Sequence, residues 1–321
     1  MSSSKNETEI YYKGGVMLIH TQENDLSIPD KLNWEVATRP LNFKSKGNFT
    51  FPKGILKDVP EDRYSCLVRD DTEEFISIVG SRYEPTQYKD ICEKQAQGLE
   101  KSGLLKKGNF TCKDYLFDGY GKFKREVVLD DLTIEPKVGD IVNFKQSSIS
   151  SHDGSIPNTS DSTPRKLSCD NGMITPLWKL IFTFRHTVNF NIEVLTDIFE
   201  ESTKKFFEME PYFKSMGEKR ISRSEVEQTL KETICRRIAT KKNKREHNEK
   251  LLGWLLEQFN VEASELGYSM WAFYNTLTHW ATHPEQYDYK ENTKFHNIAR
   301  QNSDKVLVFL NTPQFRGLMD R

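Results

Sequence analysis

The amino-acid sequence predicts an α+β fold, with antiparallel strands in its first half and helices in its second half. Apolar and polar residues alternate at 64–79 and 123–129, which is typical of strands with one buried face. From residue 176 onward apolar residues instead recur at the spacing of one helix face. Segregation of the two patterns along the chain indicates an α+β arrangement. The expected parts are a partly flexible N-terminal segment at 1–29, an antiparallel sheet region at 30–172 with a packed helix at 87–102, and a helical region at 173–321 packed on the sheet.

The strand-rich half begins with a hairpin at 64–79, whose turn lies in the acidic stretch 70–73. A helix is expected over 87–102. Thr86 is placed to cap its N-terminus, and Gly103 stands where a left-handed residue ends a helix. This segment therefore predicts two paired strands followed by one helix.

A second group of strands follows the helix. The dipeptide Asp118-Gly119 separates two apolar runs and predicts the turn of another hairpin. Residues rich in serine, aspartate, proline and threonine then predict a loop at 150–165. The expected strands of this group lie at 115–117, 123–129, 141–149 and, as a short extended piece, 167–169.

The second half predicts several helices with clear start signals. Ser222 and Glu225 form a capping box, in which each residue bonds the backbone of the other. Ser269 is placed to cap a further helix, which ends before Pro284. The apolar stripe of the first helix consists of Ile192, Leu195, Ile198, Phe199 and Phe206.

The charge balance limits the classes of partner. The chain has 321 residues, of which 46 are Lys or Arg and 47 are Asp or Glu, so the formal net charge is −1. This balance argues against attraction of the whole molecule to nucleic acid or to an anionic membrane. Local patches can still bind, because salt limits charge effects to about 10 Å.

Cysteine usage and hydropathy indicate the compartment. The five cysteines lie far apart, include no Cys-x-x-Cys pair and follow no secretory leader, which is typical of reduced thiols. No apolar run approaches the ~18 residues that a membrane helix needs. We therefore expect a cytoplasmic protein without a membrane partner.

The most polar part of the chain lies at 151–155 and 166–172. A zinc site would need paired ligands two to four residues apart, and this spacing does not occur here. A cysteine nucleophile would need Cys169 beside a histidine such as His152 or His186. We expect no metal and no cofactor, and interpret the stretch as a loop held by hydrogen bonds, with structural roles for His152, Asp153, Gly154, Ser155, Cys169 and Asn171.

Two basic features suit nucleic acid. Tyr120, Lys122 and Lys124 fall at alternate positions of an expected strand, which places them on one face. On such a face cations neutralise phosphate, and a ring stacks bases at ~1–3 kcal/mol each. A basic run at 236–245 would contact phosphates without reading sequence, and the alternative for both features is a solvated charged face. The expected nucleic-acid-binding residues are Arg82, Tyr120, Lys122, Lys124, Arg125, Arg165, Lys166 and Arg185, and no catalytic residue is expected.

Short motifs occur in a fixed order along residues 30–285: VRDDT at 68–72, IVGSRYEPTQ at 78–87, VGD at 138–140, SHDGS at 151–155, LSCDNG at 167–172, RHT at 185–187 and WAFYNTLTH at 271–279. Together they resemble the phage/plasmid-like protein family of unknown function. The chain departs from that family at Thr276, where alanine is usual, and in an expanded loop at 156–163. The resemblance implies a phage or mobile-element protein of the bacterial cytoplasm with a role in DNA metabolism, and it carries no catalytic residue.

The hairpins followed by one helix are also similar, at the level of fold analogy, to phage single-strand annealing proteins. That analogy implies a homo-oligomer that anneals single-stranded DNA in recombination or replication. Two other hypotheses stay open. One is an interaction factor that modulates a host or phage protein, and the other is a thiol- or metal-dependent hydrolase using His152, Asp153 and Cys169.

Overall fold

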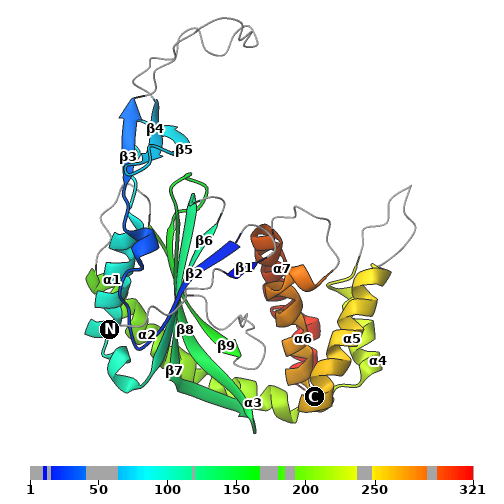
Figure 1. The fold of residues 1–321 in the computed structure, drawn as a ribbon. Coiled ribbons are helices and arrows are strands. Elements are labelled where there is room, and N and C mark those ends of the chain that lie inside the picture. Colours follow the sequence, from blue (N-terminus) through cyan, green and yellow to red (C-terminus); the bar gives the residue numbers. More distant parts are fainter. Residues whose placement is uncertain are drawn as a thin grey trace, which may run out of the picture.

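The computed structural model describes residues 10–12, 16–40, 64–117, 120–166, 180–184, 192–236, 248–287 and 295–320. Within these ranges strands occupy the N-terminal half and helices the C-terminal half (Figure 1), which confirms the α+β class. None of the helices in these ranges combines the length and apolar character that a membrane crossing requires.

The larger sheet has seven strands, is antiparallel throughout, and follows the order β1-β2-β6-β7-β8-β9-β10. Its centre is the long hairpin of β7 and β8, in which Lys122 pairs with Ser151 and Lys137 with Asp140. The N-terminal segment contributes two of its strands. The strands are β1 (Ile10–Tyr12), β2 (Val16–Glu23), β6 (Phe110–Phe117), β7 (Lys122–Lys137), β8 (Asp140–Ser151), β9 (Asn158–Lys166) and β10 (Leu180–Phe184).

The predicted loop at 150–165 is wrong over most of its length, because β9 occupies its second part. Serine and threonine are poor indicators of a strand by themselves, but here a neighbouring strand bonds one of their hydroxyl groups. Gln146 Nε2 donates to Ser160 Oγ at 2.6 Å. Pro164 is tolerated because β10 pairs only with residues 158–162, so the proline lies where β9 has become an outer strand.

The smaller sheet has three antiparallel strands in the order β3-β4-β5 and confirms the hairpin predicted at 64–79. The acidic turn between its last two strands is closed by a hydrogen bond from Glu73 N to Arg69 O at 2.9 Å. The strands are β3 (Val36–Pro40), β4 (Tyr64–Arg69) and β5 (Phe75–Gly80). Figure 1 shows this sheet projecting from one end of the molecule.

Most of the predicted helix signals are confirmed. Ser222 and Glu225 form the capping box, and the Ser269 side chain accepts a hydrogen bond from Ala272 N. Gly103 takes φ 69 after the first helix. The helices are α1 (Tyr88–Lys101), α2 (Ile192–Glu208), α3 (Glu210–Glu218), α4 (Arg223–Glu232), α5 (Glu249–Leu266), α6 (Met270–Thr282), α7 (Phe295–Leu310) and α8 (Pro313–Met319), with short 3-10 helices η1 (Asp30–Leu32), η3 (Leu104–Lys107) and η4 (Pro284–Gln286).

The predicted cap of α1 is wrong. Gln87 occupies the N-cap position, and its side chain bonds the backbone of Val36 instead of the helix. The Thr86 hydroxyl is taken by Asn158 Nδ2, which donates to it at 2.8 Å. The start of α1 is therefore tied to β3 and β9 rather than capped locally.

Helices α1 and α2 cover one face of the large sheet (Figure 1), and apolar side chains from β6, β7 and β8 pack beneath them in one core. The two helices approach closely at Gly98, where an added Cβ would lie 2.9 Å from the Phe199 ring. α6 is buried along almost its whole length among α3, α5 and α7, and its side chains belong to the same core.

Candidate functional site

The loop between β8 and β9 is fixed by contacts to the first residue of α1 and to the segment before it. The His152 ring stacks on Tyr88 with centroids 3.8 Å apart and planes 8° apart, and its Nε2 lies 2.9 Å from Thr86 O. Tyr83 Oη donates to Ser151 O at 3.1 Å. The SHDGS and RYEPTQ motifs, about 70 residues apart in the sequence, therefore form one packed unit.

The tip of the same loop is an Asx turn. Ser155 N donates to Asp153 Oδ1 at 2.9 Å, and Gly154 takes φ 72, a conformation that favours glycine. Burial alone would raise the pKa of Asp153, but its hydrogen bonds to the Ser155 side chain and backbone and to Ser151, and the charge of Lys122, lower it. Lys122 Nζ lies 3.6 Å from Asp153 Oδ2. Cys169 and Asn171 lie outside the described residues.

Arg125 does not face solvent. Its side chain is 1% exposed and forms a bidentate pair with Asp114 on β6, at 2.7 and 2.8 Å. The same guanidinium donates to the backbone oxygens of Leu26 and Ser27. Arg125 points to the α1 side of the sheet, opposite to Lys124, because successive residues of a strand point to opposite faces. It anchors the chain after β2 and is not available to a phosphate.

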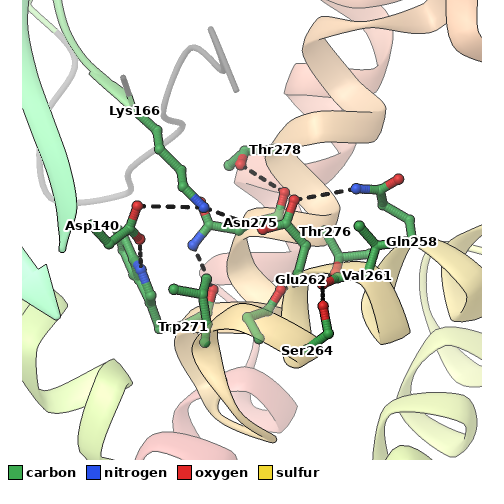
Figure 2. A network of polar contacts seen from close by, with 12 residues as sticks. Asp140, Lys166, Gln258, Val261, Glu262, Ser264, Trp271, Asn275, Thr276 and Thr278 are labelled. Carbon is green, nitrogen blue, oxygen red and sulfur yellow. Dashed lines mark hydrogen bonds and ion pairs between the residues drawn. The ribbon is translucent and has the colours of Figure 1, made fainter. Parts of the chain in front are cut away.

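Lys166 is also buried, at 1% exposure, where β9 ends beside α5 and α6 (Figure 2). Its Nζ lies 3.2 Å from Glu262 Oε2 and 3.5 Å from Asp140 Oδ1. Trp271 Nε1 donates to the other oxygen of Asp140, and Gln258 Nε2 donates to Glu262 Oε1 at 3.2 Å. This polar group joins the large sheet to the C-terminal helices and keeps Lys166 away from ligands in solvent.

The other predicted nucleic-acid contacts lie in different surroundings. Tyr120 has φ 71 and packs against Trp34, while the Arg69 guanidinium covers its ring at 4.6 Å. Arg82 is exposed in the turn after β5, and Arg165 is largely buried on the large sheet. Arg185 lies outside the described residues. The predicted cradle of Arg82, Lys122, Lys124 and Arg125 is not brought together, because Lys122 and Lys124 share one face of β7 while Arg125 points to the other. Carboxylates also pair with three of the predicted residues: Asp153 with Lys122, Asp114 with Arg125 and Glu262 with Lys166.

A different set of side chains shares the face of the large sheet that α1 and α2 leave uncovered. We call this set the polar sheet face. Lys124 retains the predicted orientation on it, with Nζ 6.0 Å from the Tyr115 ring centroid. Tyr115 and Phe117 lie side by side on β6 with centroids 6.5 Å apart. The set consists of Lys113, Tyr115 and Phe117 on β6, Lys122, Lys124 and Glu126 on β7, Lys145 and Ser147 on β8, and Asp161 on β9.

The lysines and carboxylates of the polar sheet face are not paired one to one. Glu126 contacts two ammonium groups, Lys124 at 2.5 Å and Lys145 at 3.0 Å. Burial acts to raise the pKa of Glu126, but the two lysines outweigh it and hold that pKa well below its ordinary value. The neighbouring carboxyl of Asp161 behaves in the opposite way, because burial raises its pKa and the same lysines offset this only in part. Glu126 thus serves two lysines, and Asp161 lies beside the same pair.

Thiol and metal chemistry find little support in the described part of the chain. Burial raises the pKa of Cys112 and of Cys235 to about 12, and raises that of Cys92 as well, so these thiols stay protonated. Across the described ranges, histidine, cysteine and carboxylate side chains do not gather in groups of three or more that could hold a metal ion.

Tyr115 and Phe117 are the residues that the sequence reasoning missed. The signal was present, since buried residues alternate along β6 with Thr111, Lys113, Tyr115 and Phe117. A strand that is buried on one face and carries lysine beside aromatic rings on the other differs from an ordinary solvated strand. The prediction placed a strand only at 115–117, so the alternation over the full eight residues was not visible.

The chain belongs to the family described as Domain of unknown function (DUF932), whose family model matches residues 75–306. The match agrees with the resemblance noted for the motifs, and it spans both the polar sheet face and the Lys166 network. No curated protein and no solved structure matches the chain.

Proposed function

We propose that the protein binds single-stranded nucleic acid on the polar sheet face. The observation that carries the proposal is the pair of rings, Tyr115 and Phe117, side by side on a partly accessible strand beside Lys113 and Lys124. Rings on a sheet can stack successive bases, and neighbouring lysines can neutralise the phosphates between them.

The charge distribution supports binding that is moderate and independent of sequence. Lys124 and Lys145 both pair with Glu126, and Lys113 adds a further positive charge on β6. Stacking on a ring leaves the edge of a base free for pairing. A single strand held in this way could pair with its complement, which supports a role in strand annealing.

Fluorescence anisotropy with a labelled oligothymidylate tests the proposal. We expect binding at low salt with micromolar protein. Tyr115→Ala should weaken it by about tenfold, because a stacked base contributes ~1–3 kcal/mol. Tyr115→Phe is the matched control, since it keeps the ring and loses only the hydroxyl, and it should bind nearly as the wild type does. Absence of binding at low salt, or equal binding by both variants, contradicts the proposal.

A further inference from the structure

The smaller sheet presents an apolar outer strand. Among the described residues, β5 pairs only with β4 and forms one border of the sheet. Its six residues, FISIVG, include no charge and no proline, the devices by which proteins usually protect such a border. The backbone groups on its outer side are therefore available to another strand.

A β-bulge determines which side chains this strand exposes. The pairing of β4 with β5 shifts between Leu67 and Val68, so Phe75 lies opposite Val68 and Ile78 lies opposite Cys66. Phe75 and Ile78 consequently share the outer face although they are three residues apart. Phe75 is 59% exposed and Ile78 is 50% exposed, and Tyr64 lies on the same face. Three large apolar side chains thus adjoin an open strand border.

We infer that β5 pairs with β5 of a second copy of this chain, antiparallel and about a two-fold axis near Ile78. Such an arrangement is self-complementary, because each copy contributes the same strand. It places the start of β5 in one copy beside the end of β5 in the other. Glu74 directly precedes β5 and Arg82 follows it. Both side chains are exposed, so the two ends of the strand have opposite charge. The inference is independent of the proposed nucleic-acid binding.

Charge reversal tests the arrangement directly. Sedimentation equilibrium of the wild type should give a species of twice 37.4 kDa. Glu74→Arg and Arg82→Glu, made singly, should each raise the dissociation constant of the dimer about tenfold, because each places like charges together at both ends. The double variant E74R/R82E should restore the wild-type value. A monomeric wild type contradicts the inference, and so does a double variant as weak as the single ones.

Two further measurements separate this interface from a general effect on folding. Ile78→Lys places a charge on the half-exposed border and should give a folded monomer, as judged by circular dichroism. Val308→Lys is the matched control, since Val308 is equally apolar, 68% exposed and located on α7, and this variant should remain a dimer. Hydrogen exchange at residues 76–80 should slow as protein concentration rises. A dimer in which exchange there is unchanged would place the contact elsewhere and overturn the inference.

Discussion

Lys166 Nζ and Glu262 Oε2 lie 3.2 Å apart, although 96 residues separate them in the sequence. The first stands at the end of the large sheet and the second on α5, and both are at most 4% exposed. Asp140, from the VGD motif, completes the group, and Trp271, from the WAFYNTLTH motif, bonds to it. Motifs dispersed along the chain therefore meet where the sheet joins the helices.

Removing the ammonium of this group should destabilise the protein strongly. Lys166→Met leaves two carboxylates buried without their cation, and breaking a buried ion pair in this way costs about 3–5 kcal/mol. Urea unfolding measures the loss. The triple variant K166M/D140N/E262Q removes the charges together and should recover much of the stability. If the triple variant is no more stable than Lys166→Met, the charges are not the cause.

The close approach of α1 and α2 predicts opposite effects for one substitution at two helical glycines. Gly98→Ala should destabilise by about 1–3 kcal/mol, because its Cβ would lie 2.9 Å from the Phe199 ring. Gly253→Ala in α5 meets no atom within 4 Å and should stabilise by about 0.5–1 kcal/mol. Thermal unfolding compares the two variants, and a stabilising Gly98→Ala would show that α1 and α2 are not packed as described.

Acid should act on the polar sheet face through Glu126. The pKa of Glu126 is lowered in the folded state, so its contribution to stability is complete above the unfolded pKa and is lost as pH falls toward the folded pKa. Glu126→Gln should therefore show a smaller loss of stability than the wild type between neutral pH and acid. A slope of stability against pH equal to that of the wild type would contradict the pairing with Lys124 and Lys145.

Asp161 should show the opposite dependence. Burial raises the pKa of Asp161 in the folded state, so the folded protein favours the protonated carboxyl. Its contribution to stability is therefore lost as pH rises through the folded pKa. Asp161→Asn should therefore stabilise the protein at neutral pH and leave its stability in acid nearly unchanged. The same denaturation series measured from acid to neutral pH checks this. Destabilisation at neutral pH would mean that the carboxylate is well solvated or fully paired.

The sequence predicted those parts of the fold that depend on neighbouring residues. The hairpin at 64–79 follows from local alternation and an acidic turn, and the α4 and α6 caps follow from single side chains at fixed spacing. β9 could not be predicted in this way. Its polar sequence becomes a strand through pairing with β8 and β10 and through contacts such as that of Gln146 with the Ser160 hydroxyl.

The burial of charged residues also could not be predicted from neighbouring residues in the sequence. Arg125 reads in the sequence as part of a basic strand, and Lys166 as part of a polar loop. Their neutralising partners, Asp114 for the first and Glu262 for the second, come from other elements of the fold. A charge pattern along one strand fixes which face a side chain occupies, as it does for Lys124, but not whether another segment covers it.

Salt should weaken nucleic-acid binding in a manner that reports on Lys113. For single strands each neutralised phosphate contributes about 0.7 to the slope of log affinity against log salt. Lys113→Ala should reduce the slope by about that amount. Lys106→Ala is the control, because Lys106 is exposed on η3, away from the polar sheet face. Equal slopes for both variants would remove Lys113 from the binding surface.

Photocrosslinking tests the central claim most directly, because it reports which residues touch the nucleic acid. An oligonucleotide that contains 5-iodouracil is irradiated with the full-length protein, and the attached peptide is identified by mass spectrometry. Crosslinks at Tyr115 or Phe117 are the predicted result. Crosslinks confined to the basic run at 236–245, or none at a protein concentration that saturates binding, would contradict the assignment of the polar sheet face.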